Sequence, residues 1–137
     1  MAGWTVKKIA AIPTVAGDFG PGDPDWFPLQ HALGIDTFGV NLFAATRPDQ
    51  ELVEEHDERE SQQQELYLVL DGEAAFYLDG EELRLPEGTA VAVTDPSVRR
   101  RATAVTEGTR LLIIGAGPGA FASSWNPRHF ADIPRPE

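Results

Sequence analysis

One stretch of the chain gathers residue types that can hold a cation or a polar ligand. It begins at His56, includes Glu58, Glu60 and Glu65, and ends in an apolar run. In a regular strand, positions 56, 58 and 60 share one face because side chains alternate. Carboxylates with at most one histidine suit hard cations such as Mg²⁺, Ca²⁺ or Mn²⁺ better than a tight zinc or copper site. The same residues could also form a solvated acidic strand edge with a histidine at its rim, and both interpretations stay open.

A second polar group, the run Arg99-Arg100-Arg101, lies further along the chain. Strand alternation sends Arg99 and Arg101 to one face and Arg100 to the other. A guanidinium has no free lone pair and stays protonated, so it cannot ligate a metal and would repel one. An arginine that faces the acidic stretch would therefore disfavour a metal there.

Other familiar catalytic motifs are absent or incomplete. The chain has no cysteine, which excludes a disulfide framework, a thiolate zinc site and a cysteine nucleophile. No Gly-x-Ser-x-Gly sequence supports serine hydrolase chemistry. The glycines from Gly115 to Gly119 lack the spacing of a phosphate loop, and Pro118 opposes a helix start. The sequence does not identify a catalytic residue.

The central region predicts short antiparallel strands that would hold these residues in place. The turns Asp71-Gly72, Asp79-Gly80 and Glu87-Gly88 recur every eight residues, and Asp-Gly pairs favour tight hairpins. Six strands are predicted, over Leu66–Leu70, Ala74–Leu78, Glu82–Leu85, Thr89–Thr94, Val98–Val105 and Arg110–Gly115. Strands this short and regular predict an antiparallel sandwich or barrel rather than a βαβ fold.

The flanking segments predict further elements. Phe38–Thr46 and Leu52–Glu60 add two strands, Pro24–Leu33 holds a short helical turn, and Gly17–Pro24 forms a loop. We expect the tail from Pro118 to cross the barrel surface as an irregular segment. The core or pocket lining is predicted to include Tyr67, Val69, Phe76, Leu78, Val91 and Val93, with the face of Phe38 and Val40 beside them.

The length and charge of the chain limit its class. A chain of 137 residues fits one domain, which we divide into an N-terminal arm 1–35, a barrel of roughly 36–115 and a tail 116–137. The net charge of −11 argues against nucleic acid and anionic membranes as partners. We find no apolar run near the ~20 residues of a membrane span and no signal peptide, so we expect a cytoplasmic protein.

Residues 56–72 resemble the first motif of the cupin superfamily. That motif has a His-x-His pair and then a Glu separated from a Gly by six residues, a spacing that Glu65 and Gly72 keep. Gly88–Thr103 is similar to the second motif, with Arg99 in place of its histidine and Thr103 in place of its asparagine. The resemblance covers roughly residues 36–115, and more loosely the whole chain looks like small bacterial cupins of undefined function. It implies an all-β fold, an antiparallel double-stranded β-helix or jelly-roll barrel.

The resemblance also implies a metal site of three histidines and one glutamate, which this sequence has partly lost. With the shorter gap between ligands, Glu58 and Glu60 replace two histidines. With the longer gap, His56 is kept and Glu58 replaces the second histidine. Glu65 is retained and Arg99 replaces the third histidine in both registers. By the same resemblance Arg99 and Arg101 point into the barrel, where Arg99 pairs with Glu65 or meets an anionic or carbonyl-bearing ligand.

We therefore expect a barrel that binds a small-molecule ligand and holds no cofactor. The expected ligand-binding residues are Glu65, Arg99, Arg101, Tyr67, His56 and Glu58. One alternative is a metal-dependent enzyme of dioxygenase or isomerase type, with a weakly bound divalent metal at His56, Glu58 and Glu65. Another is a structural or regulatory dimer with a filled pocket. We expect a homodimer, because free edge strands favour pairing and the stretch Trp4–Ile12 is apolar enough to contribute.

Overall fold

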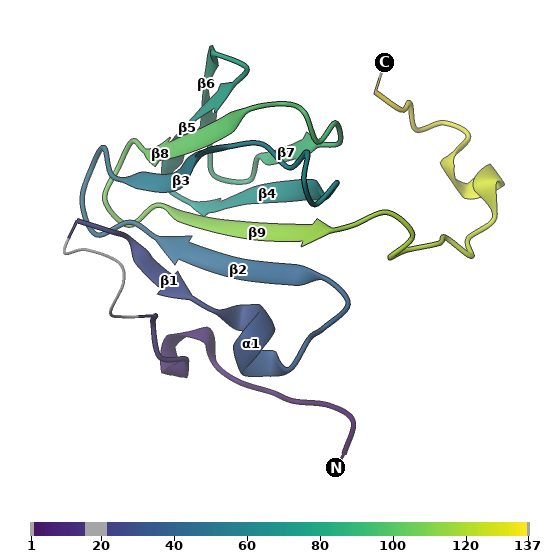
Figure 1. Cartoon of the computed structure of the whole chain (residues 1–137), viewed down its shortest axis with the longest axis horizontal. Coiled ribbons are helices and arrows are strands. Elements are labelled where there is room, and N and C mark those ends of the chain that lie inside the picture. The colour runs from purple at the N-terminus through teal and green to yellow at the C-terminus, as the bar shows by residue number, and fades with distance from the viewer. Residues whose placement is uncertain (1, 16–21, 137) are drawn as a thin grey trace.

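Two antiparallel sheets form the body of the chain in a computed structural model that describes residues 2–15 and 22–136 (Figure 1). The five-stranded sheet has the order β1 (Asp25–Phe27), β2 (Gly39–Ala44), β9 (Arg110–Ala116), β4 (Gln64–Asp71) and β7 (Ala90–Val93). The four-stranded sheet has the order β3 (Glu51–His56), β8 (Arg100–Ala104), β5 (Glu73–Leu78) and β6 (Glu81–Pro86). The prediction of an all-β antiparallel jelly-roll barrel is confirmed.

The predicted turns are formed by glycines with left-handed backbone. Gly72, Gly80, Gly88 and Gly108 all have φ near +80°, between 78° and 85°. Such angles strain any residue with a Cβ, which explains why each turn carries glycine. At Gly72 a Cβ would also lie 2.4 Å from the hydroxyl oxygen of Thr109. The predicted strands between these turns are present, with ends that shift by a few residues.

Cross-strand rows decide which side chains of the five-stranded sheet face the barrel interior. Tyr67 on β4 lies opposite Val91 on β7 and Ile113 on β9. This row packs into the main core between the sheets, where the predicted residues Tyr67, Val69, Phe76 and Val93 are buried and Leu78 and Val91 are partly buried. The neighbouring residues along β4 point to the outer face of the sheet.

A second apolar cluster covers part of that outer face. Val40 and Leu42 of β2 are buried there beneath Leu29 of helix α1 (Leu29–Leu33) and Ile12 of the N-terminal arm. The prediction that Phe38 and Val40 face the main core is therefore wrong. Phe38 is exposed, and the register of β2 with β9 turns residues 40 and 42 outward.

The flanks differ from the predictions in detail. The predicted helical turn divides into β1 and α1, and most of the predicted loop Gly17–Pro24 lies outside the described residues. Two 3-10 turns cover Ile9–Ala11 and Pro127–Phe130. From Pro118 to Pro136 the tail is exposed and extends away from the sheets instead of crossing them (Figure 1). Within the described residues, no helix has the length and apolar character to cross a membrane.

Candidate functional site

A cavity of about 700 Å³ opens among β1, β2, β3, β4 and β9. Its apolar wall consists of Trp26, Phe43, Leu52, Val53, Tyr67 and Ile113. Its polar end includes His56 and Glu65, and its rim includes Asp23, Glu51, Glu54 and Glu55. The cavity thus brings together an aromatic wall, the predicted histidine and the predicted glutamate.

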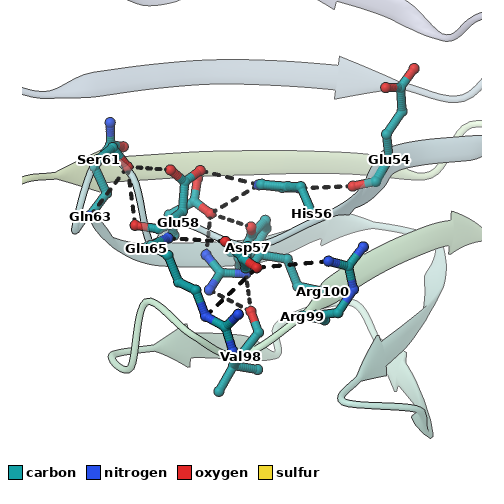
Figure 2. A network of polar contacts seen from close by, with 12 residues as sticks. Glu54, His56, Asp57, Glu58, Ser61, Gln63, Glu65, Val98, Arg99 and Arg100 are labelled. Carbon is teal, nitrogen blue, oxygen red and sulfur yellow. Dashed lines mark hydrogen bonds and ion pairs between the residues drawn. The ribbon is translucent and has the colours of Figure 1, made fainter.

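Glu65 lies at the centre of a polar network (Figure 2). Its Oε1 accepts hydrogen bonds from the Tyr67 hydroxyl at 2.6 Å and from Nη1 of Arg100 at 2.7 Å. The side chain is 11% exposed, which confirms the prediction that it faces inward. Gly115 on β9 lies opposite and leaves room, because a Cβ there would be 3.3 Å from Cγ of Glu65.

Arg100 is a buried cation whose Nε, Nη1 and Nη2 all donate hydrogen bonds. Its side chain is 1% exposed. Besides the pair with Glu65, Nε and Nη2 donate to the carbonyl oxygen of Val98 at 3.1 and 2.8 Å. A buried guanidinium needs such partners because its desolvation is costly. Arg100 therefore supplies the fixed positive charge that balances Glu65.

The prediction that Arg99 and Arg101 point into the barrel is wrong. Arg99 is 53% exposed and pairs with Glu55 at 3.4 Å, while Arg101 pairs with Glu51 at 2.8 Å outside the core. The inward positions of β8 are 100, 102 and 104, all buried. Small alanines at 102 and 104 fill the interior, and strand alternation then carries residue 100 inward with them. Both predicted roles of Arg99, as partner of Glu65 and as ligand contact, fail with its exposure.

His56 ends β3 and points its ring at two carboxylates. Nδ1 lies 2.7 Å from the carbonyl oxygen of Glu54 and must carry the hydrogen of that bond, since the carbonyl only accepts. Nε2 lies 3.2 Å from Oε1 of Glu58 and 3.6 Å from Oε1 of Glu65. In a neutral imidazole Nε2 is an acceptor, so three acceptor atoms converge. A proton on Nε2, a cation or a ligand's donor group satisfies them.

Glu58 reaches this group from the turn after β3. Its backbone N–H donates to Pro96 and its carbonyl accepts from Gln62, which fixes the turn. The Ser61 hydroxyl donates to Oε2 of Glu58 (Figure 2). Glu60 is exposed on the same turn. The structure thus brings together His56, Glu58 and Glu65, as in the longer-gap register.

Tyr67 is held as a neutral hydrogen-bond donor. Burial first, and then the hydrogen bond to the Glu65 carboxylate, raise the pKa of Tyr67 far above its ordinary value. The phenol therefore keeps its proton and donates it to Glu65. A fixed donor of this kind orients the carboxylate within the network.

Four residues at the site were not singled out from the sequence. Trp26 stacks on Phe43 with ring centroids 5.8 Å apart, and its Nε1 donates to Oδ1 of Asn41 at 2.9 Å. Phe43 and Asn41 are the inward residues of β2, opposite Leu111 and Ile113. Alternation within the predicted strand would have identified them once its inward face was known. Arg100 was missed for the same reason.

The metal site implied by the cupin resemblance fits these residues only in part. His56, Glu58 and Glu65 each offer one ligand atom, and these three atoms lie within 4.8 Å of one another, so one cation could bind all three. The set lacks two of the three histidines that the cupin resemblance implies. In addition, the Arg100 guanidinium already contacts the Glu65 carboxylate. One histidine with two carboxylates favours a hard cation over zinc or copper.

Comparison with known proteins gives a consistent fold. No protein-family model matches the sequence, and no curated protein matches it. A cupin protein from Bacteroides fragilis has a TM-score of 0.69 at 18% identity, over 91% of this chain and 93% of that one. A sugar phosphate isomerase of the cupin superfamily from Silicibacter pomeroyi has a TM-score of 0.67 at 20% identity, over 82% and 75%.

A third similar structure has a different described activity. Pac13 from Streptomyces, described as a nucleoside dehydratase, has in a structure with uridine a TM-score of 0.57 at 17% identity, over 90% of this chain and 87% of that one. Identities this low show a common fold and leave the chemistry of this site to its own residues. The strand order, the facing sheets and these similar structures together show that this chain has the cupin fold.

Proposed function

We propose that the barrel binds a small organic molecule that presents hydrogen-bond donors, such as hydroxyl or amine groups, to His56, Glu58 and Glu65. One observation carries this proposal: the Glu58 and Glu65 carboxylates converge on Nε2 of His56, and His56 and Glu65 line the polar end of the cavity. Cavities of about 300–1,000 Å³ with apolar walls and a few polar groups are typical of ligand sites, and this one measures about 700 Å³.

The donor inventory of the site supports a donor-bearing ligand. The Tyr67 hydroxyl and the Arg100 guanidinium already donate to Oε1 of Glu65 and to Val98. Within the described residues, every hydrogen bond of the Glu65 carboxylate involves Oε1, which leaves Oε2 available to a ligand. A phosphate or carboxylate would add further acceptors where acceptors already face one another, and it would be disfavoured.

The charge of the rim supports the same class of ligand. The cavity lining includes one basic residue, Arg47, and four acidic residues, Asp23, Glu51, Glu54 and Glu55. Arg99 and Arg101 neutralise Glu55 and Glu51 from outside. The remaining charges, Asp23 and Glu54 against Arg47, sum to −1, and a negative entrance lowers the local concentration of an anion and raises that of a cation. Neutral polyols and amines therefore fit better than anions, whereas the sequence offered an anionic or carbonyl-bearing ligand at Arg99 as one of two alternatives.

The aromatic wall provides an apolar contact for such a ligand. The rings of Trp26 and Phe43 stack in the wall of the cavity, where Phe43 lies opposite Leu111 of β9, four residues along that strand from the Gly115 that lies opposite Glu65. Aromatic faces pack against the C–H faces of rings and attract cations through their π-systems. A molecule with one apolar face and several donors would use both walls of the cavity.

A fragment screen by ligand-observed NMR tests this proposal. Some probes are matched pairs of a neutral molecule and its phosphorylated form, such as uridine and uridine monophosphate. The others are simple polyols, amines and carboxylates. We expect binding among neutral and amine members and a loss of binding in Glu58→Gln. The control Glu60→Gln alters the exposed glutamate on the same turn and should bind normally. Preferential binding of the anionic members, or binding indifferent to Glu58, would reject the proposal.

A divalent cation is the second candidate occupant, favoured by the convergence of His56, Glu58 and Glu65 within 4.8 Å. Mn²⁺ added to metal-free protein, followed by electron paramagnetic resonance, measures this directly. If the site holds the ion, His56→Ala loses the bound signal and Glu60→Gln keeps it. Equal Mn²⁺ binding in wild type and His56→Ala would assign any bound ion to the acidic surface.

A further inference from the structure

We propose that the C-terminal segment 118–136 of one chain binds the outer face of β4 and β7 in a second copy, and that the exchange is reciprocal. Three features carry this inference. One is an apolar outer face, another is a groove almost free of charge, and the third is a tail whose large apolar side chains are exposed.

Strand β4 is apolar on both faces. Its inward residues are Glu65, Tyr67 and Val69, and its outward residues after Gln64 are leucines at 66, 68 and 70. An antiparallel sheet with a solvated face normally alternates apolar and polar residues. Three outward leucines in succession instead indicate a face that another layer covers.

The outer face is covered only in part within the described chain. Helix α1 and Ile12 cover β2 and the adjoining side of β9. Leu66 lies in a row with Ala92 of β7 and Ile114 of β9, and this row lines a groove of about 580 Å³. Among the described residues that line the groove, Glu65 alone carries a charge, and its carboxylate faces the barrel interior.

The low charge of this groove favours a second copy as the occupant. A chain of net charge −11 repels its own kind over most of its surface. Interface cores are depleted of charged residues. The groove is therefore a place where two copies can approach with little electrostatic cost.

The tail offers the complementary apolar surface. Trp125, Phe130 and Ile133 are 69%, 42% and 62% exposed, and Phe121, at the edge of the groove of its own chain, is 81% exposed. The segment is locally ordered, since the Asn126 side chain caps the turn Pro127–Phe130 and the rings of Trp125 and Phe130 lie 5.9 Å apart. Figure 1 shows this segment extended away from the sheets. An ordered apolar segment that leaves its own barrel is suited to binding another.

The position of the groove fits a two-fold exchange. The groove is bounded by Pro118–Phe121, where the tail leaves β9. A two-fold axis near these residues places each tail beside the groove of the other chain. Adjacent strands lie about 4.8 Å apart, so a segment of this length easily spans β9, β4 and β7 of a partner.

The available area is that of a stable dimer. A whole aromatic side chain buries about 150–250 Å². Two tails, together with the surfaces they cover, would then bury on the order of 1,500 Å², within the ~1,200–2,000 Å² of specific interfaces. By this estimate the tails reach the area of a specific interface without a contribution from the N-terminal stretch Trp4–Ile12.

Light scattering of the full chain at tens of micromolar, after size-exclusion chromatography, tests the inference. We expect the mass of two chains for wild type and of one chain for Trp125→Ser/Phe130→Ser. The matched control Trp4→Ser/Val6→Ser changes side chains of similar exposure in the other arm, 73% and 82%, and should stay dimeric. A monomeric wild type, a dimeric tail variant or a dissociated control would each overturn the inference.

Cross-linking between separate chains tests the docking site itself. The sequence has no cysteine, so chains carrying Ser124→Cys and Ala92→Cys can be mixed and oxidised. We expect a disulfide between positions 124 and 92, formed at least ten times faster than with Glu81→Cys on β6 in place of Ala92→Cys. Equal rates would overturn the assignment of the groove, even if the protein is a dimer.

Discussion

Two ion pairs formed from neighbouring residues of β8 lie on opposite faces of its sheet. Arg100 meets Glu65 at 2.7 Å inside the barrel, where both side chains are almost fully buried. Arg101 meets Glu51 at 2.8 Å, and both of these side chains are more than a third exposed. The distances are nearly equal, so burial must account for any difference in their effects. Inside, each charge depends on its partner, whereas outside water and salt replace the partner.

The largest expected effect follows from removing the buried cation. Arg100→Met keeps much of the length of the side chain and leaves the charge of Glu65 without its partner, at a position where the Glu65 side chain is only 11% exposed. Breaking a buried pair in this way costs about 3–5 kcal/mol. Urea unfolding should show this loss as a shift in midpoint with little change in slope. A loss below about 1 kcal/mol would mean that the pair behaves like a surface pair.

An intermediate effect is expected for Tyr67→Phe, which removes the hydroxyl that donates to Glu65. A hydrogen bond to a charged group contributes about 1.5–3 kcal/mol. The destabilisation should appear at neutral pH in the same unfolding measurement. Unchanged stability would show that the hydroxyl contributes nothing to the network.

The same tyrosine predicts a dependence on alkaline pH. Its pKa is higher in the folded chain than in the unfolded chain, where it is about 10. Its contribution is therefore complete below pH ~10 and is lost as the pH rises, because the unfolded chain then releases a proton that the folded chain retains. Relative to Tyr67→Phe, wild type should lose up to ~1.4 kcal/mol per pH unit above that point. If the free energies of unfolding of wild type and Tyr67→Phe changed in parallel with pH, the raised pKa of Tyr67 would be contradicted.

The smallest effect is expected on the outer face of β8. Arg101→Gln removes an exposed pair with Glu51 and a contact over the Tyr77 ring at 4.8 Å. Exposed pairs contribute about 0–1 kcal/mol, and added salt should reduce the difference from wild type further. A loss as large as that of Arg100→Met would remove the distinction between the two faces.

The strands could be predicted from the sequence because their turns and apolar runs are well marked. On β4 both faces are apolar from Leu66 to Leu70, so alternation did not decide the orientation, and the position of Glu65 in the motif did; the inward orientation of Glu65, Tyr67 and Val69 was correct. On β8 the contrast is weak, since Val98–Val105 offers apolar residues at both parities and the three arginines are identical in type. The resemblance then suggested the wrong parity, and Arg100 was overlooked.

The acidic end of β3 could be predicted only as a set of alternatives. The pairing of β3 with β8 shifts register twice, once between Glu51 and Val53 and again before His56. Such irregularities make simple alternation unreliable. Glu58 also lies beyond the strand, on a turn fixed by bonds to Pro96 and Gln62. Its approach to His56 depends on the three-dimensional course of that turn, which residue spacing does not encode.

The central claim is that Arg100 is the fixed counter-charge of Glu65 inside the barrel. A double-mutant cycle of Arg100→Met and Glu65→Gln, measured by urea unfolding, tests it most directly. We expect the double variant to be more stable than Arg100→Met alone, because the second change removes the stranded carboxylate, with a coupling of about 2–3 kcal/mol. Additivity within about 0.5 kcal/mol would contradict it.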